Sequence, residues 1–130
     1  MITTLVIDAS AAIKAVLGKS SLADIIKKAN RIVAPELYIS EIINVFWKYT
    51  TFSEMPQTES NRLQKICLDI PDHYISSLES ADKILKTAIT HKKSAYDIHY
   101  IELAKTMNAT LLTEDKVLKN LARKLLIPTE

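Results

Sequence analysis

The sequence predicts an α/β fold in which a short, central parallel sheet is covered by helices on both faces, giving three layers. Short apolar segments rich in β-branched residues alternate along the chain with longer segments whose apolar residues recur every three or four positions. Strands and helices that alternate in this way form βαβ units around a parallel sheet. The chain has 130 residues, of which 48 % are hydrophobic, and this suits one globular domain. We therefore expect residues 1–130 to form a single domain.

The first half of the chain is expected to contain two strands and four helices. Ser10 is a suitable N-cap for the first helix, and Gly18 is a suitable residue to end it. Pro35 marks the end of the second strand. The expected strands are 2–7 and 31–34, and the expected helices are 11–17, 22–29, 39–47 and 56–68.

The second half is expected to contain three helices and two strands. The pattern of Leu78, Ala81, Ile84, Leu85 and Ala88 is typical of an amphipathic helix. The expected helices are 77–89, 94–107 and 117–122, and the expected strands are 110–113 and 125–127.

Composition excludes few functions. No apolar run approaches the ~18 residues that cross a bilayer, so no membrane association is expected. Residues 1–8 have no basic region before their apolar run and indicate a strand rather than a signal peptide. Cys67 is the single cysteine, which fits a reducing compartment, and we expect a cytoplasmic protein. The net charge of +2 is too small to indicate nucleic-acid binding by itself.

Four acidic residues stand at or near expected element boundaries: Asp8, Glu41, Asp97 and Asp115. In parallel sheets, ligands bind beyond the carboxyl ends of the strands, and Asp8 and Asp115 follow such ends. Each acid also has a simpler interpretation. Asp8, Asp97 and Asp115 are suited to helix starts, and Glu41 to a solvated helix face.

Taken together, the segments around these acids resemble the PIN-domain family, in particular the VapC-type toxins of bacterial and archaeal toxin–antitoxin pairs. The resemblance runs in order through nearly the whole chain. It is carried by Val-Ile-Asp-Ala-Ser-Ala at 6–11, Pro-Glu-Leu at 35–37 with Glu41 and Asn44, Ser-Ala-Tyr-Asp at 94–97, Tyr-Ile-Glu-Leu-Ala at 100–104, and Leu-Leu-Thr-Glu-Asp-Lys at 111–116.

The resemblance implies a PIN-like fold and a ribonuclease that hydrolyses RNA phosphodiester bonds with bound Mg²⁺ or Mn²⁺. It implies that Asp8, Glu41, Asp97 and Asp115 are both the catalytic residues and the metal ligands. Asp8 and Asp97 are expected to bind the metal directly. Ser10 and Thr113 match hydroxyl positions of the family and are expected to support the acids by hydrogen bonds. A homodimer and a small antitoxin partner are further implications.

Two departures from the family pattern affect this reading. The turn at 107–109 lacks the glycine common in the family, but Asn108 tolerates a left-handed backbone. Glu114 lies beside Asp115 and makes the identity of the last ligand ambiguous.

The chemistry of the four acids agrees with this resemblance. Mg²⁺ prefers oxygen ligands and keeps several of its waters, whereas zinc favours histidine and cysteine. We do not expect His73, His91 or His99 to act as catalytic bases. His73 and His91 have polar surroundings, and His99 is two residues from Asp97 on the same expected helix, so it faces away from that acid.

Two other groups of residues have open interpretations. Lys92 and Lys93 precede Asp97 and are expected near the site, where they would contact RNA phosphates or simply remain solvated. An aromatic group in the long helix is interpreted as core or dimer interface: Phe46, Trp47, Tyr49 and Phe52.

Two other functions remain as alternatives to a ribonuclease. A receiver-type signalling domain requires an acidic pair after its first strand, where this chain has Asp8 followed by Ala9. A non-catalytic PIN-like binding module is the second alternative, and the presence of all four acids argues against it.

Overall fold

Four parallel strands form the central sheet of the computed structural model, which describes residues 4–130, and their spatial order is β3-β2-β1-β4. The inner strands are the first two in the sequence, so β1 has a neighbour on each side. The strands are β1 Thr4–Ile7, β2 Arg31–Pro35, β3 His73–Ile75 and β4 Thr110–Leu112. Residues 2 and 3 of the expected first strand lie outside the described residues.

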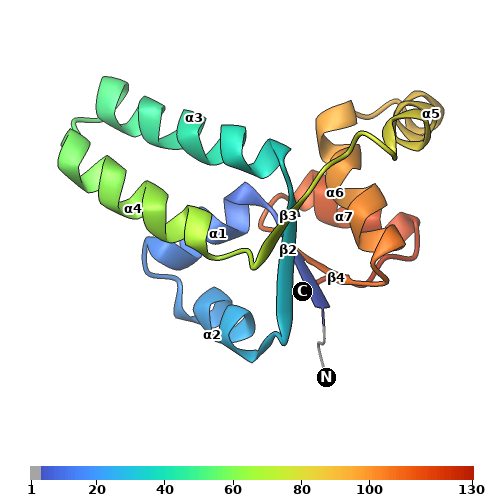
Figure 1. The fold of residues 1–130 in the computed structure, drawn as a ribbon, viewed down its shortest axis with the longest axis horizontal. Coiled ribbons are helices and arrows are strands. Elements are labelled where there is room, and N and C mark those ends of the chain that lie inside the picture. Colours follow the sequence, from blue (N-terminus) through green and yellow to red (C-terminus); the bar gives the residue numbers. More distant parts are fainter. Residues whose placement is uncertain (1–3) are drawn as a thin grey trace.

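Seven helices cover the two faces of this sheet across the described residues. On one side lie α1 Ala9–Val16, α2 Ser20–Lys28, α3 Leu37–Phe52 and α4 Gln57–Asp69 (Figure 1). On the other lie α5 Ala81–His91, α6 Ala95–Thr106 and α7 Lys116–Lys124. The predicted three-layer α/β architecture with a short parallel sheet is therefore confirmed. No helix in residues 4–130 has both the length and the apolar character needed to cross a membrane.

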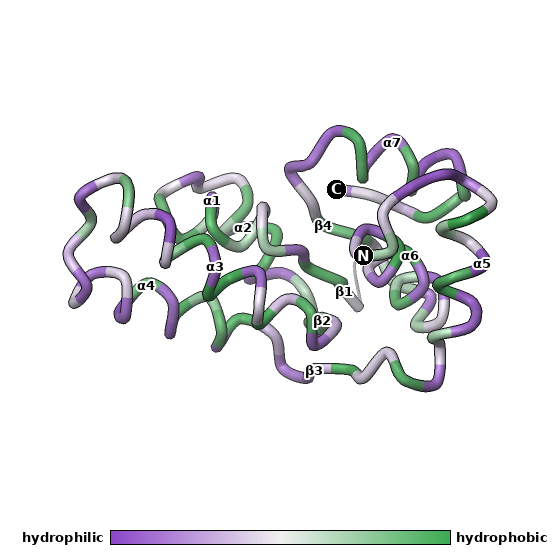
Figure 2. The backbone as a smooth tube through the Cα atoms, turned by 90° about the horizontal axis from the view of Figure 1, so that it is seen from above, coloured by the Kyte–Doolittle hydropathy of each residue, from purple (hydrophilic) through white to green (hydrophobic). Residues whose placement is uncertain are grey.

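The core fills the space between the sheet and each helical layer. Leu5, Val6 and Ile7 of β1 are all fully buried, although successive residues of a strand point to opposite faces. Hydrophobic segments of the strands accordingly lie between the two groups of helices (Figure 2). Helix α6 packs across β1, β2 and β4 and contributes the buried side chains of Ile98 and Ile101 to the core. The packing of α6 on the sheet thus fixes the ends of β1 and β4 and the start of α6, where the candidate site lies.

Three expectations about local structure are wrong. Residues 125–127 form no strand, because Leu126 has a φ of 62°, and the chain instead pairs with β4 two residues later through an isolated bridge between Leu111 and Thr129. Strand β3 was not expected, since it is a three-residue edge strand without a buried face. Asp8, rather than Ser10, is the N-cap of α1, and its side chain accepts a hydrogen bond from the backbone N–H of Ala11.

Two turns behave as the sequence predicts. Gly18 follows the end of α1 with a φ of 115°, a conformation that glycine adopts without a steric penalty. Asn108 has a φ of 50° in the tight turn between α6 and β4, so asparagine takes the place of the missing glycine. This turn sets the direction of β4, whose far end leads into the candidate site.

The dependence of the domain on the packing of α6 can be tested with Ile101→Ala. Ile101 is 1 % exposed, so removing its side chain atoms leaves a cavity against the sheet. We expect a loss of about 2–5 kcal/mol in the free energy of unfolding, measured by urea denaturation. Ile89→Ala, at a position that is 67 % exposed on α5, is the matched control and should cost far less. Similar losses in the two variants would contradict the assigned packing of α6.

Candidate active site

The four predicted acids are brought to the carboxyl edge of the sheet by four different elements. Asp8 directly follows β1, and Asp115 comes shortly after β4 as the N-cap of α7. Glu41 lies in the second turn of α3, the helix that follows β2. Asp97 lies in the first turn of α6, after the N-cap residue Ser94. Because the strands are parallel, these positions gather at one edge although they span more than a hundred residues of sequence.

Asp8 is the most buried of the four acids, with 5 % of its surface exposed. Its Oδ1 accepts hydrogen bonds from the Ala11 backbone N–H at 2.9 Å and from the Ser10 hydroxyl at 2.7 Å. Its Oδ2 accepts a hydrogen bond from the hydroxyl of Thr113, which is fully buried at the end of β4. Ser10 and Thr113 therefore make the supporting hydrogen bonds expected of them, and they orient both oxygens of Asp8.

Asp115 and Glu114, the two candidates for the last acidic position, differ in their contacts. Asp115 Oδ1 accepts hydrogen bonds from the N–H groups of Val117 and Leu118, at 2.9 and 3.2 Å, and the Asp115 N–H donates to Thr113. Glu114 forms an ion pair with Lys19 of α2. That ion pair lowers the pKa of Glu114, with Lys14 contributing further. The charge of Glu114 is thus balanced by lysines, whereas the charge of Asp115 acts on Asp8 and Asp97.

Glu41 is held by a partner that sequence reasoning did not find. The hydroxyl of Tyr100 donates a hydrogen bond to Glu41 Oε1, joining α6 to α3. Tyr100 is 2 % exposed, so its hydroxyl has little access to water. The segment Tyr-Ile-Glu-Leu-Ala at 100–104 belongs to the resemblance, but nothing in its spacing connects Tyr100 to a residue 59 positions away.

The charges of the four acids act on one another. Burial raises the pKa of Asp8, and the negative charge of Asp115 raises it further, while hydrogen bonds from Thr113, Ala11 and Ser10 act against both. Burial is also the main cause of the raised pKa of Glu41, to which Asp8 and Asp97 add. The pKa of Asp97 is likewise raised by burial and then by Asp115, and the nearby Lys93 lowers it. The four carboxyl groups therefore form one electrostatic cluster, here called the acid cluster.

The acid cluster is accessible from outside the protein. A groove of about 440 Å³ beside it is lined by Glu41, Asn44 and the exposed Tyr96, together with residues at the start of α3. Tyr96 directly precedes Asp97, and 65 % of its surface is exposed. A charged, extended molecule can reach Glu41 along this groove without any change in the core.

The donor set of the acid cluster suits a hard divalent cation. All four side chains offer carboxylate oxygens, and Asp115 Oδ2 and Glu41 Oε2 have no hydrogen-bond partner among residues 4–130. Within the same residues, however, no three acidic, histidine or cysteine side chains lie close enough together to hold one ion. A cation here would be bound by fewer side chains and keep several waters, as Mg²⁺ commonly does.

The remaining expected residues have varied surroundings. His99 Nδ1 makes a 2.7 Å hydrogen bond with the Ser77 hydroxyl, and burial lowers the pKa of this histidine. Phe46 is buried and Tyr49 packs against it, so these two aromatic residues belong to the core. Trp47 and Phe52 are exposed, by 52 % and 71 %, and contact each other edge to face.

Comparison with known proteins gives the family and supports the fold. The sequence profile of the PIN domain family matches residues 5–124, so the chain belongs to the PIN domain family. Proteins of this family are generally nucleases. Among solved structures, the crystal structure of PAE2754 from Pyrobaculum aerophilum is similar, with a TM-score of 0.72 and 21 % identity over 97 % of this chain and 98 % of that one. This likeness shows the fold alone. No curated protein matches the chain significantly.

The raised pKa of Asp97 predicts how substitution affects stability without metal. A carboxyl whose pKa is higher in the folded than in the unfolded state lowers the free energy of unfolding as the pH rises through that interval. Asp97→Asn removes this cost. In EDTA at neutral pH the variant should therefore melt no lower than the native protein, with the difference shrinking toward acid pH. Thermal melting over a pH series measures both effects.

Asp24→Asn, which removes the charge of an exposed residue on α2, is the control and should leave the melting temperature almost unchanged. If Asp97 only supports the start of α6, the result is the opposite. A helix-start aspartate stabilises its helix, so its replacement would lower the melting temperature at neutral pH. That outcome would remove Asp97 from the acid cluster.

Proposed function

We propose that this PIN-domain protein is a divalent-metal-dependent endoribonuclease, with Asp8, Glu41, Asp97 and Asp115 as its catalytic and metal-binding residues. The observation that carries the proposal is the acid cluster itself. At the carboxyl edge of the sheet, burial and the charges of neighbouring acids raise the pKa values of Asp8, Glu41 and Asp97, and Lys93 lowers that of Asp97. A cation bound among them would relieve this repulsion.

Each residue has a distinct task in this proposal. Asp8 and Asp97 would hold Mg²⁺ or Mn²⁺, with Glu41 and Asp115 completing the site through water, because no three acidic side chains of the described residues lie close enough together to hold one ion. Such an ion supplies an activated water near neutral pH and neutralises charge on the phosphate oxygens. Ser10, Thr113 and Ala11 hold Asp8 in one orientation, and Tyr100 does the same for Glu41. Preorganised ligands of this kind avoid reorganisation during the reaction.

The surroundings of the acid cluster suit a single-stranded RNA substrate. The exposed ring of Tyr96 lies beside the groove that leads to Glu41, and unstacked bases pack on aromatic rings. Lys93 lies within electrostatic reach of Asp97 and is placed to contact a phosphate. The expectation that this residue lies near the site, formed from its sequence position before Ser94, agrees with that placement.

The two alternative functions, a receiver-type signalling domain and a non-catalytic PIN-like module, fit these findings less well. Membership of the PIN domain family excludes a receiver-type signalling domain. A PIN-like module that binds RNA without cutting it would not need four acids that repel one another, since their combined charge also repels phosphate. The acid cluster favours the catalytic function.

The ribonuclease proposal predicts that the purified protein cleaves single-stranded RNA with Mg²⁺ or Mn²⁺ and not in EDTA. Asp8→Asn, Asp97→Asn and Asp115→Asn should each lower the cleavage rate by about a hundredfold or more, because each removes a proposed ligand charge. Glu114→Gln is the matched control. It lies next to Asp115 but is paired with Lys19, and it should keep most of the activity.

Gel assays with a labelled RNA, together with melting curves for every variant, separate loss of catalysis from loss of folding. Undiminished cleavage after complete metal removal would overturn the metal-dependent function. Equal losses in Glu114→Gln and Asp115→Asn would overturn the assignment of the fourth acid. Binding of RNA without cleavage under all metal conditions would instead establish the non-catalytic module.

From the resemblance to VapC-type proteins, we further propose that this protein is a cytoplasmic toxin, that it forms a homodimer, and that a small antitoxin protein binds it. The exposed apolar side chains Ile43, Trp47 and Phe52 on α3 support a surface that a protein covers. Light scattering should give twice the chain mass of 14.6 kDa.

Expression of the native protein in bacterial cells should arrest their growth, whereas expression of the Asp8→Asn variant should not. Continued growth with active, soluble enzyme would overturn the toxin role.

A further inference from the structure

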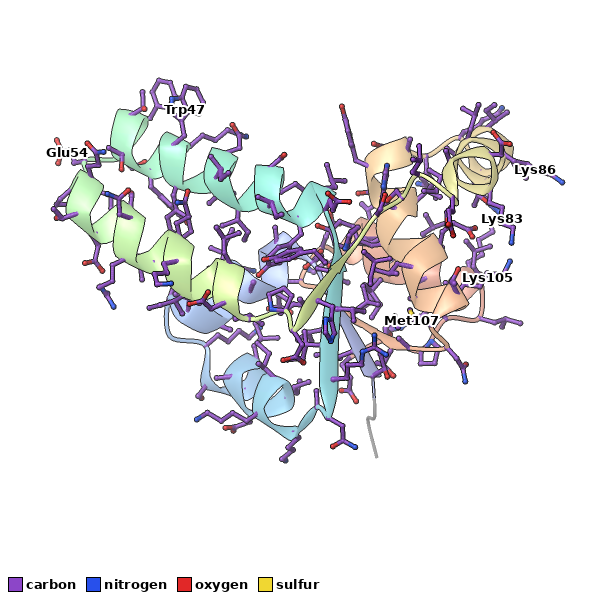
Figure 3. The ribbon with its side chains drawn as sticks, viewed as in Figure 1. Trp47, Glu54, Lys83, Lys86, Lys105 and Met107 are labelled. Carbon is purple, nitrogen blue, oxygen red and sulfur yellow. The ribbon has the colours of Figure 1, made fainter. Side chains whose placement is uncertain are left out.

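A basic groove runs between α5 and α6, on the opposite side of the sheet from the α3–α4 hairpin. It has a volume of about 570 Å³. Its walls carry three lysines, Lys83 and Lys86 of α5 and Lys105 of α6, and the hydroxyl groups of three threonines, Thr87, Thr90 and Thr106. The three lysines lie on one flank of the molecule, far from Trp47 and Glu54 at the tip of the hairpin (Figure 3).

The lysines of this groove are available to an external anion. All three are exposed, and none takes part in an ion pair formed within residues 4–130. Lys83 and Lys86 are three residues apart on α5, so they project from the same side of that helix. The acidic residue in the lining is Glu102, which is 5 % exposed and accepts a 3.1 Å hydrogen bond from the Thr87 hydroxyl. Its charge lies in the floor of the groove, and the lysines form the rim.

The basic groove is connected to the acid cluster by further basic side chains. His91 lines the basic groove and also a second groove of about 280 Å³ between the end of α5 and α7. That second groove is lined by Lys93 and Lys124 as well, together with Asn120. Lys93 in turn acts on the charge of Asp97. Basic groups thus follow one surface from Asp97 around the α5–α6 turn to Lys83 and Lys86.

We propose that this surface is a path for the RNA backbone, and that the groove between α5 and α6 binds phosphates of the substrate several nucleotides away from the acid cluster. The proposal rests on the ribonuclease function and names the route of its substrate. Lysine binds phosphate as a point charge, and such contacts do not distinguish one base from another. The groove therefore contributes affinity for long RNA of any sequence, and the residues near Tyr96 and the acid cluster meet the bond that is cut.

The overall charge of the protein makes this placement informative. The net charge is only +2, so a positive surface cannot arise from a general excess of lysine. Among the acids near this surface, Asp82 of α5 is exposed but does not line the groove. Glu114 is paired with Lys19, and Asp115 caps α7. Phosphate contacts by lysine release counterions, which makes this binding strongly dependent on salt.

The test compares two triple variants with the same loss of charge. K83Q/K86Q/K105Q removes the lysines of the basic groove. K27Q/K28Q/R31Q, the control, removes three exposed cations at the end of α2 and the start of β2, at the opposite edge of the sheet. Fluorescence polarisation in EDTA measures binding of a single-stranded RNA of about 30 nucleotides, which is longer than the ~4–16 nucleotides of a compact binding site. Because no cleavage occurs in EDTA, binding is measured independently of catalysis.

The groove variant should bind the long RNA about 10- to 100-fold more weakly than the native protein at about 0.1 M salt, with a salt slope smaller by about 2, from ~0.7 per phosphate contact. The control should bind nearly as the native protein does. With Mg²⁺, the groove variant should cleave an RNA of about 4 nucleotides at the native rate, since so short a strand fits near the acid cluster. Its KM for the long RNA should rise while its kcat stays near the native value.

Several results would overturn the proposal. They are equal binding by the two triple variants, no RNA binding by the native protein, or equal loss of cleavage on short and long RNA. A change in the molecular mass of the groove variant, without a change in RNA affinity, would assign the groove to contact between copies of the chain. Loss of long-RNA binding in the groove variant, with no cleavage by any form of the protein, would uphold the path and overturn the catalytic function.

Discussion

Asp8 occupies the point at which β1 ends, α1 begins and β4 passes beside them, and its carboxylate connects all three. Its Oδ1 caps α1, and its Oδ2 receives the hydroxyl of Thr113 from the end of β4. A carboxylate with 5 % exposure is stable in its charged form only when donors surround it. The loops that supply these donors must therefore meet at this place. The same requirement brings Asp115, two residues after Thr113, into electrostatic contact with Asp8.

The layered fold makes this arrangement rigid. Helix α6 packs on three strands through Ile98 and Ile101, and it presents Asp97 at its first turn and Tyr100 one turn later. Tyr100 then fixes Glu41 on the opposite helical layer. Two helices on different faces of the sheet are thus joined across its edge by one hydrogen bond. Sites built on helices and strands hold their side chains more accurately than sites built on loops alone.

The layers of the fold could be predicted from the sequence, because they depend on local patterns, and so could the position of two acids at the ends of strands. Buried parallel strands are continuous apolar runs, and Asp8 directly follows one of them while Asp115 comes three residues after another. Strand β3 could not be predicted, since its three residues pair with β2 at an edge and bury no face. Two contacts could not be predicted from the sequence either: the hydrogen bond from Tyr100 to Glu41, and the ion pair of Glu114 with Lys19. Such contacts join residues distant in sequence and depend on how the helices pack.

The interpretation of these acids as helix caps and their interpretation as metal ligands are compatible. Asp115 uses one oxygen, Oδ1, to accept from two N–H groups of α7, while its other oxygen has no partner in the described part of the chain. Asp8 and Asp97 also stand at helix starts, where the helix dipole favours negative charge. The helix starts thus let the protein concentrate carboxylates that repel one another, because Asp8, Asp97 and Asp115 are each stabilised by the helix at whose start they lie. The repulsion that remains is what a divalent cation would relieve, so the proposed function implies that metal stabilises the folded protein.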